Sequence, residues 1–147
     1  MDHDVFSNVP LMVQHLRNLT DLPHYIGGQL NPHSPAVRAI DDKWFTPWEL
    51  YPEDYYPPYV DGPCYFLSGA VVPLIYGAAL KEKLFHFEDI FITGLIPRDH
   101  LHLPVQNVSR SHIYQTERLV TNVKDLVTIH PTSPQKMYEY YNLTVNP

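Results

Sequence analysis

Apolar residues in this chain recur in short helical or strand-like patterns, which are separated by long polar and proline-rich segments. Residues 10–19 place three leucines and a methionine near one face of a helix, and Pro10 suits its first turn. Residues 21–42 are rich in glycine, proline, asparagine and histidine, so they predict a loop with short strands. Residues 64–67 predict a short strand.

A second set of elements follows along the chain. The apolar run after residue 67 predicts a helix over residues 69–83, with Ser68 as its cap. Its apolar side chains indicate a buried core helix rather than a cofactor site. Residues 126–130 predict a strand, and residues 134–141 predict a helix capped by Ser133. Together these patterns predict a loop-rich fold of mixed helices and strands.

Composition narrows the class of protein. The chain has 147 residues, a hydrophobic fraction of 44% and 15 prolines, which favours a globular, loop-rich domain over a helical bundle. Its formal charge is -6, and the ten lysines and arginines are scattered, so no nucleic-acid partner is expected. Cys64 is the only cysteine, which excludes a disulfide within the chain. No signal peptide or membrane-spanning stretch is predicted.

Residues 43–59 hold both tryptophans and several tyrosines among carboxylates. Aromatic rings stack on the apolar face of a pyranose, and carboxylates accept hydrogen bonds from its hydroxyls, so this mixture suits carbohydrate. The alternative is that Trp44 and the tyrosine–proline pairs are ordinary core and turn residues. The Pro57-Pro58 pair predicts an extended approach to a turn at residues 61–63. Both interpretations of the aromatic residues stay open at this point.

Two acidic pairs are candidates for chemistry. Asp2 and Asp4 flank one residue, and on an extended segment they can offer oxygen ligands to a hard divalent cation. An ordinary solvated acidic terminus has the same sequence. Glu88 and Asp89 precede a predicted helix, where carboxylates complement the positive end of the helix dipole. A carboxylate in that place can also act as a general base.

A set of aromatic, proline, glycine and acidic landmarks follows in a defined order over residues 43–94. The landmarks are Lys43-Trp44, Tyr51-Pro52, Tyr56-Pro57-Pro58-Tyr59, Gly62, Tyr65, Leu67-Ser68 and Glu88-Asp89. Their order and spacing resemble the carboxyl half of the Golgi β-1,3-glycosyltransferases, the galactosyltransferase and N-acetylglucosaminyltransferase family numbered 31. The resemblance extends more loosely to both ends of the chain.

This resemblance implies an α/β fold of the glycosyltransferase type called GT-A. Residues 1–147 would be the carboxyl-terminal part of a single catalytic domain, without the amino-terminal nucleotide-binding half. The implied reaction is inverting β-1,3 transfer of galactose or N-acetylglucosamine from a UDP-sugar to a glycan acceptor, with manganese as the cofactor. The implied location is the lumenal side of the Golgi membrane, with a membrane anchor only in a full-length form.

The resemblance also implies roles for single residues. Asp89 matches the catalytic base of the family. Asp2 and Asp4 match the outer aspartates of its metal-binding segment, whereas His3 departs from the middle one. His130, near the carboxyl end, is the candidate that completes the metal shell, and a histidine that merely ends a strand is the equally open alternative.

Four further positions, Trp44, Gly62, Tyr65 and Glu88, match the family and are expected to bind the donor or the acceptor. Four residues around Gly62 differ from the cysteine, serine or small residues that are usual there: Val60, Asp61, Pro63 and Cys64. The resemblance therefore does not define the donor preference. Gly94 stands one residue later than in the family, so either Thr93 is inserted or the pattern is shifted.

Two alternatives to an active transferase remain open from the sequence. One is a catalytically inactive fragment that lacks most donor affinity. The other is a carbohydrate-binding module that uses its tryptophans and tyrosines without any chemistry.

Overall fold

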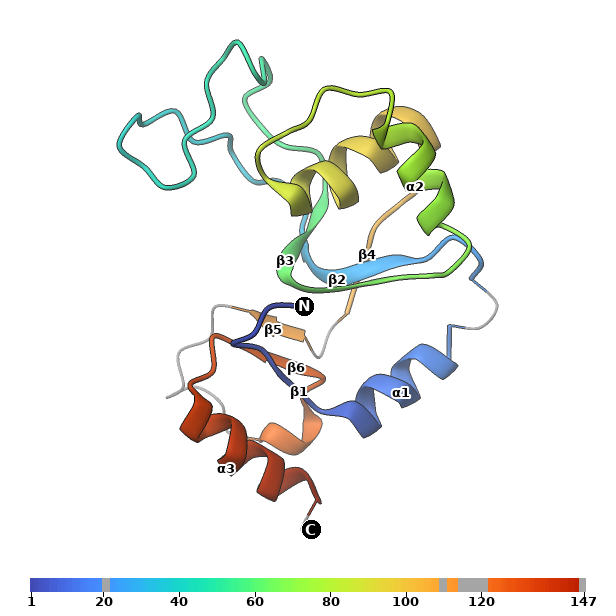
Figure 1. The fold of residues 1–147 in the computed structure, drawn as a ribbon, viewed down its shortest axis with the longest axis vertical. Coiled ribbons are helices and arrows are strands. Elements are labelled where there is room, and N and C mark those ends of the chain that lie inside the picture. The colour runs from blue at the N-terminus through green and yellow to red at the C-terminus, as the bar shows by residue number, and fades with distance from the viewer. Residues whose placement is uncertain (20–21, 109–110, 114–121, 146–147) are drawn as a thin grey trace.

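The structure is a computed structural model that describes residues 1–19, 22–108, 111–113 and 122–145. It contains two small mixed sheets, which lie one above the other in Figure 1. One sheet has the order β1 (Phe6–Ser7), β6 (Thr128–His130) and β5 (Ser111–Ile113). The other has the order β3 (Tyr59–Leu67), β2 (Ile26–Asn31) and β4 (Gln106–Asn107). The predicted mixture of helices and strands is confirmed.

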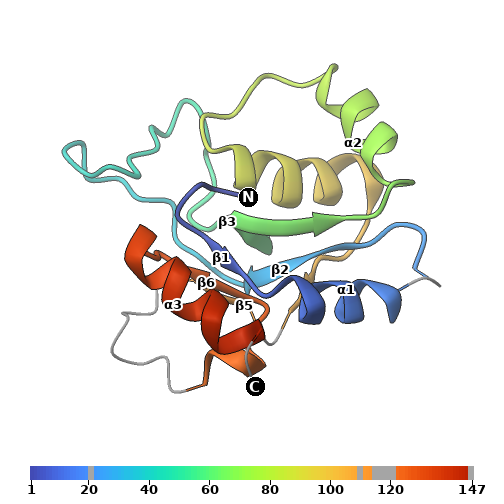
Figure 2. The ribbon, with the colours of Figure 1, turned by 60° about the horizontal axis from the view of Figure 1, so that its bottom comes forward.

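Helices cover both sheets (Figures 1 and 2). The helix of residues 88–101 and α2 (Val72–Ala79) pack on one face of the β2–β3 sheet, where the largest core lies. On the other face, α1 (Val9–Arg17) packs against Phe66 and its neighbours. Alternate β3 side chains supply both cores, because successive residues of a strand point to opposite faces.

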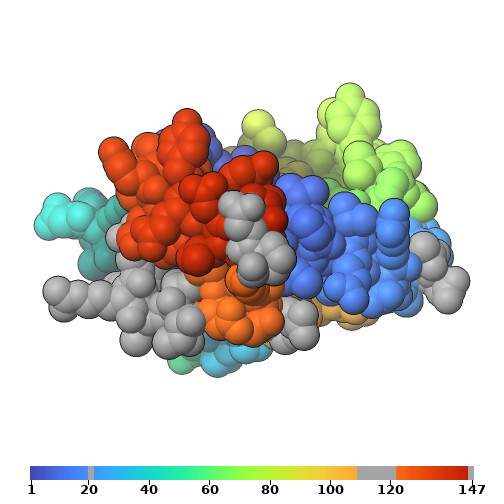
Figure 3. Space-filling model, turned by 90° about the horizontal axis from the view of Figure 1, so that it is seen from below, coloured from blue at the N-terminus to red at the C-terminus, as the bar shows by residue number. Residues whose placement is uncertain are grey.

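The first helix is confirmed, although it covers Val9–Arg17 rather than the predicted residues 10–19. The helix α1 begins after Asn8, whose side-chain oxygen accepts a hydrogen bond from the Leu11 amide at 3.4 Å. This cap satisfies one of the free amides at the helix start, and Pro10 occupies the first turn as predicted. Seen from below, α1 and α3 (Pro134–Val145) reach the same surface of the molecule (Figure 3).

The carboxyl-terminal prediction is also confirmed in outline. The strand β6 is shorter than the predicted residues 126–130, and α3 is longer than the predicted residues 134–141. Ser133 caps α3 as expected, because its hydroxyl oxygen accepts from the Lys136 amide at 3.3 Å. The Phe6 and Tyr140 rings meet edge to face, with centroids 5.4 Å apart. This contact attaches α3 to the β1–β6–β5 sheet.

The predicted turn at residues 61–63 is wrong, because these residues lie inside β3. The strand has a bulge here. Leu30 pairs with Val60 and Gly28 with Tyr65, so β3 has more residues than β2 between these two pairs. A bulge tolerates Pro63, which has no amide hydrogen for a sheet partner. Sequence patterns typical of a turn therefore mark a distorted strand.

The helix predicted over residues 69–83 is shorter, and Ser68 does not cap it. The Ser68 hydroxyl instead accepts a hydrogen bond from the Tyr25 amide at 3.0 Å and donates one to the Pro23 carbonyl, tying the end of β3 to the segment before β2. The prediction of a buried core helix is also wrong for most of α2. Ile75 and Ala78 are its buried residues, because a helix that covers one face of a sheet buries one stripe only.

A helix begins at the acidic pair Glu88 and Asp89, as predicted. Most of it has the wide turns of a π-helix, over Ile90–Leu95 (η1) and Pro97–Leu101 (η2). A π-type turn holds one more residue than an α-turn. The helix can therefore include one extra residue before Gly94, which stands one position later than in the family, without a break.

The segment of residues 32–58 projects from the body as an extended loop (Figure 1). The Arg38 guanidinium holds it together by donating to the backbone oxygens of Thr46, Tyr51 and Glu53 at 2.7, 3.0 and 2.6 Å. It also lies 3.8 Å from the centre of the Trp48 ring. These contacts give an irregular segment a defined shape. Among the described residues, no helix has the length and apolar character needed to cross a membrane.

Candidate active site

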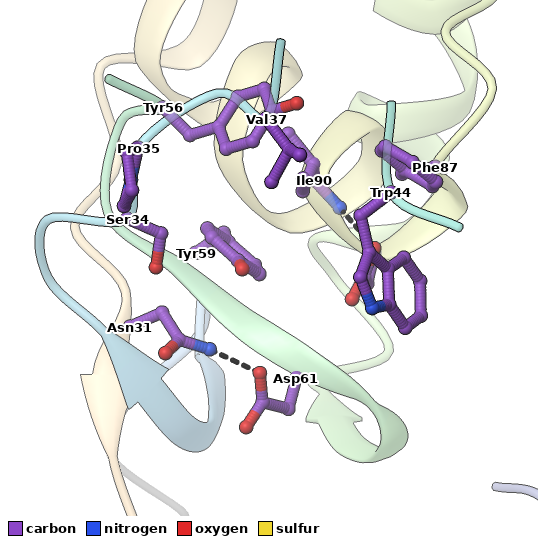
Figure 4. Close-up of a pocket in the computed structure, with 11 residues that line it drawn as sticks. Asn31, Ser34, Pro35, Val37, Trp44, Tyr56, Tyr59, Asp61, Phe87 and Ile90 are labelled. Atoms are coloured by element: carbon purple, nitrogen blue, oxygen red, sulfur yellow. Dashed lines mark hydrogen bonds between the residues drawn. The ribbon is translucent and has the colours of Figure 1, made fainter. Parts of the chain in front are cut away.

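A pocket of about 320 Å³ opens between the extended loop, β3 and the start of the helix at residue 88 (Figure 4). Its walls combine aromatic rings with two carboxylates. The lining residues are Asn31, Ser34, Pro35, Val37, Trp44, Tyr56, Tyr59, Asp61, Phe87, Asp89 and Ile90. Pockets of this size with a few polar groups in an apolar surface are typical of small-molecule sites.

The aromatic wall is partly open to solvent. Trp44 is 45% exposed, and its ring centre lies 5.4 Å from that of Phe87. Tyr56 is buried and meets Tyr59 edge to face at 6.2 Å. Lys43 lies 4.5 Å from the centre of the Trp44 ring, and Arg38 lies 3.8 Å from that of Trp48. Trp44 lines the pocket and keeps exposed surface there, but its role in binding sugar stays a prediction.

Asp89 lies at the first turn of the helix and lines the pocket. Its Oδ1 accepts a hydrogen bond from the Ile90 amide at 2.8 Å, and its Oδ2 accepts one from the Gly62 amide at 3.1 Å. Burial raises the pKa of Asp89 even though these two amides favour the charged form, and the nearby Glu88 raises it further. Asp89 is thus a helix cap and a pocket carboxylate at once.

Two glycines allow the helix to approach β3 this closely. A Cβ atom on Gly62 would lie 3.3 Å from Oδ2 of Asp89, and one on Gly94 would lie 3.0 Å from Cβ of Tyr59. Between them, the hydroxyl oxygen of the fully buried Thr93 accepts from the Val60 amide at 3.0 Å and donates to the Asp89 carbonyl at 2.6 Å. The position of Asp89 therefore depends on the π-helical turn.

The three predicted metal ligands lie together. One ligand atom from each of Asp2, Asp4 and His130 lies within 4.8 Å of the other two, and Nε2 of His130 is 3.3 Å from Oδ2 of Asp4. The antiparallel pairing of β1 with β6 produces this cluster, because it sets Phe6 opposite Ile129. Two carboxylates and an imidazole form a donor set that fits a divalent cation. Their role as metal ligands stays a prediction.

The cluster and the pocket meet at neighbouring residues of β3. The Asp2 amide donates to the Pro63 carbonyl at 2.9 Å, while the preceding residue, Gly62, donates to Asp89. The bulge in β3 thus links the acidic segment at the start of the chain to the pocket carboxylate. This link is the central geometric feature of the site.

Two of the predicted binding residues, Tyr65 and Glu88, pair with each other outside the pocket. The Tyr65 hydroxyl donates to Oε1 of Glu88, and neither residue is part of the lining given above. Burial, together with the Glu88 carboxylate, raises the pKa of Tyr65, so the phenol keeps its proton. Trp44 and Asp89 line the pocket, Gly62 touches Asp89, and the Tyr65–Glu88 pair braces the helix start. Ligand binding by Tyr65 and Glu88 stays a prediction.

Asp61 and Asn31 are pocket residues for which the sequence predicted no role. Asp61 is 5% exposed and lines the pocket, and Nδ2 of Asn31 donates to its Oδ1. Burial raises the pKa of Asp61 to about 6, opposed by the Asn31 hydrogen bond and reinforced by Asp89. The predicted turn over residues 61–63 gave no indication that Asp61 is buried, since turn residues usually lie at the surface.

Comparison with known proteins identifies the class. The model of the galactosyltransferase family matches residues 1–108. Beta-1,3-galactosyltransferase 1 of Mus musculus and of Homo sapiens are each 29% identical over 143 residues, which is 96% of this chain and 43% of the relative. Beta-1,3-galactosyltransferase 2 of Homo sapiens is 26% identical over 145 residues, with 96% and 34% covered.

The chain therefore belongs to the galactosyltransferase family, and the resemblance drawn from residues 43–94 is confirmed. It spans less than half the length of these curated relatives. The candidate site residues fall within the matched range with the exception of His130, which lies beyond residue 108.

Proposed function

We propose that this chain is the carboxyl-terminal part of a GT-A type catalytic domain that performs inverting β-1,3-hexosyl transfer. The donor is a UDP-sugar, with galactose as the sugar favoured by the relatives and N-acetylglucosamine as the second choice. The acceptor is a glycan on protein or lipid. In this proposal the nucleotide-binding half lies outside residues 1–147.

One observation carries the proposal: the acidic segment at Asp2 and the pocket carboxylate Asp89 contact neighbouring residues of the same strand bulge. A transferase that uses a nucleotide sugar needs a place for the diphosphate beside a base that receives the acceptor proton. Here the segment that carries a potential cation site contacts the bulge at Pro63, and a half-buried carboxylate contacts it at Gly62. A simple sugar-binding module has no need of this pairing.

In the proposed mechanism, the sugar rings stack against Trp44 and its aromatic neighbours. Asp89 accepts the proton of the acceptor hydroxyl as that oxygen attacks the anomeric carbon, and the single displacement inverts its configuration. The raised pKa of Asp89 makes it a better proton acceptor than an exposed aspartate. Gly62 and the Tyr65–Glu88 pair hold the Asp89 end of the helix in place.

Asp2, Asp4 and His130 would hold manganese. When bound there, the ion supplies positive charge that compensates the charge on a diphosphate leaving group. We further propose a lumenal Golgi location, which rests on the family resemblance.

The proposal is tested by calorimetric titration of UDP into the protein, with and without manganese, and by sugar-transfer assays. We expect manganese-dependent UDP binding that Asp4→Ala abolishes and that Asp41→Ala, an exposed acidic residue outside the pocket, preserves. Transfer should disappear in Asp89→Asn.

The exposed Trp44 in the pocket also suits a carbohydrate-binding module without chemistry. Glycan binding that ignores manganese and UDP, and that survives Asp89→Asn, would favour this second candidate. A folded protein that binds neither UDP nor glycan would instead indicate an inactive fragment.

A further inference from the structure

Asp61 is a buried carboxylate that the mechanism above does not use. It lies in the bulge of β3 and is 5% exposed, and Figure 4 shows it beside Asn31 within the pocket. An acidic side chain is rarely buried without a partner, because removal from water penalises its charge. The retained carboxylate therefore calls for a functional explanation.

The contacts of Asp61 leave capacity for a ligand. Within the described part of the chain, Oδ1 of Asp61 accepts a hydrogen bond from Nδ2 of Asn31. An ionised carboxylate offers about four acceptor sites on its two oxygens. Since Asp61 lines the pocket, the remaining sites are available to hydrogen-bond donors that enter it. Asn31 holds the side chain in one orientation.

The charge of the pocket restricts the ligand. Asp61 and Asp89 both line it, and its described lining residues include no lysine or arginine; the ammonium group of Lys43 lies 4.5 Å from the centre of the Trp44 ring. Two carboxylates without a cationic partner repel a phosphate group and favour a neutral ligand that carries hydroxyl donors. The aromatic walls formed by Trp44 and Tyr59 suit the apolar face of a sugar ring.

We propose that Asp61, oriented by Asn31, is a specificity-determining residue that accepts a hydrogen bond from one hydroxyl of a neutral pyranoside in this pocket. The proposal rests on the glycosyltransferase function proposed above and goes beyond it by assigning sugar selection to this pair. The diphosphate of the donor binds elsewhere, on the side of the acidic cluster. A site that hydrogen-bonds a hydroxyl discriminates strongly against the analogue that lacks it, because the buried acceptor is then left unpaired.

The test is a scan of methyl galactoside, methyl N-acetylglucosaminide and their monodeoxy analogues, with affinities measured by ligand-observed NMR. For wild-type protein, one deoxy analogue should bind at least about tenfold more weakly than its parent sugar. In Asp61→Ser that particular penalty should shrink to less than about twofold, while penalties at the other hydroxyls persist. Asp41→Asn serves as the control for loss of one negative charge.

Asp61→Asn keeps the size of the side chain and an oxygen for Asn31, so it provides a second variant if Asp61→Ser folds poorly. Near-ultraviolet circular dichroism checks the fold of each variant. An unchanged pattern of deoxy penalties in a folded Asp61 variant overturns the proposal, as does a folded wild-type protein that binds none of the pyranosides. Manganese-dependent UDP binding is measured in the same samples, so failure of sugar selection is distinguishable from failure of the transferase function.

Discussion

The acidic cluster and the aromatic pocket each contain two aspartates, but different elements bring these aspartates together. Asp2 is exposed and Asp4 is partly exposed, and strand pairing across nearly the whole chain brings them to His130. Asp61 and Asp89 are contributed by a strand bulge and a helix start, and burial raises the pKa of both. The difference fits the proposed function, in which the open cluster binds a hydrated cation and the pocket binds a neutral sugar beside a proton acceptor.

The largest expected effect separates proton transfer from cation binding. Asp89→Asn preserves the size of the side chain but removes the base, so the rate of sugar transfer should fall by about 10²–10⁴. Binding of manganese and UDP should remain close to wild type. Kinetic assays at saturating donor, paired with calorimetry, check both parts. Loss of UDP binding in Asp89→Asn would contradict the separation of the two sites.

The second prediction acts on the cluster alone. Asp4→Ala removes one carboxylate ligand and should weaken manganese-dependent UDP binding at least tenfold. Even the mutation of a residue that only hydrogen-bonds to a metal ligand lowers metal affinity by about 10–100-fold. Pyranoside binding in the pocket should not change. The measurement is calorimetric titration of both ligands, with Asp41→Ala as the control. Equal weakening by the control variant would show that the effect is general loss of negative charge.

The third prediction concerns the pH dependence of stability. Asp61 has a folded-state pKa of about 6 against an ordinary value of 3.8, so between these values the folded state binds more protons than the unfolded state. Stability therefore falls as pH rises through this range. Asp61→Asn should remove the loss and raise the free energy of unfolding at pH 7.5 by up to roughly 3 kcal/mol.

Urea unfolding of wild type and Asp61→Asn between pH 3.5 and 7.5 checks this third prediction. The two curves should converge below the ordinary aspartate pKa, where the carboxyl group is neutral in both states. If the two free energies of unfolding differ by the same amount at every pH, the charge of Asp61 is not the cause of the difference.

The smallest expected effect concerns the π-helical turn. Thr93→Val preserves shape but removes the hydroxyl that joins Val60 to Asp89, leaving a buried amide without its acceptor. We expect a loss of about 1–3 kcal/mol in the free energy of unfolding. Thr144→Val, at the end of α3, should change stability by less than about 0.5 kcal/mol. Urea unfolding of both variants at one pH provides the comparison.

Sequence patterns predicted the regular elements better than the irregular ones. The helix α1 was recognisable from its apolar face and Pro10, and α3 from the capping residue Ser133 and the proline that follows it. The residues around Gly62 were misread, because glycine and proline are typical of turns and also of a strand bulge. Ser68 was misread for a similar reason: its hydroxyl serves a distant backbone segment that no local pattern reveals.

The candidate site was predictable where it rests on family landmarks. Asp2, Asp4, Trp44 and Asp89 were singled out from their order in the chain. The meeting of the acidic segment with His130 depends on β1, a strand of two residues, which is too short to show periodicity. The burial of Asp61 depends on the bulge, so it became visible only in three dimensions.

The measurement that tests the central claim most directly is titration of manganese into isotopically labelled protein, followed by amide NMR. The paramagnetic ion broadens signals near its site, and Gly62, which donates to Asp89, directly precedes Pro63, whose carbonyl accepts from the Asp2 amide. We predict manganese-dependent broadening of the Gly62 amide in wild type and its loss in Asp4→Ala. A Gly62 amide that manganese leaves unchanged, or broadening that persists in Asp4→Ala, would contradict a cation site at the acidic cluster, beside the strand bulge that holds Asp89.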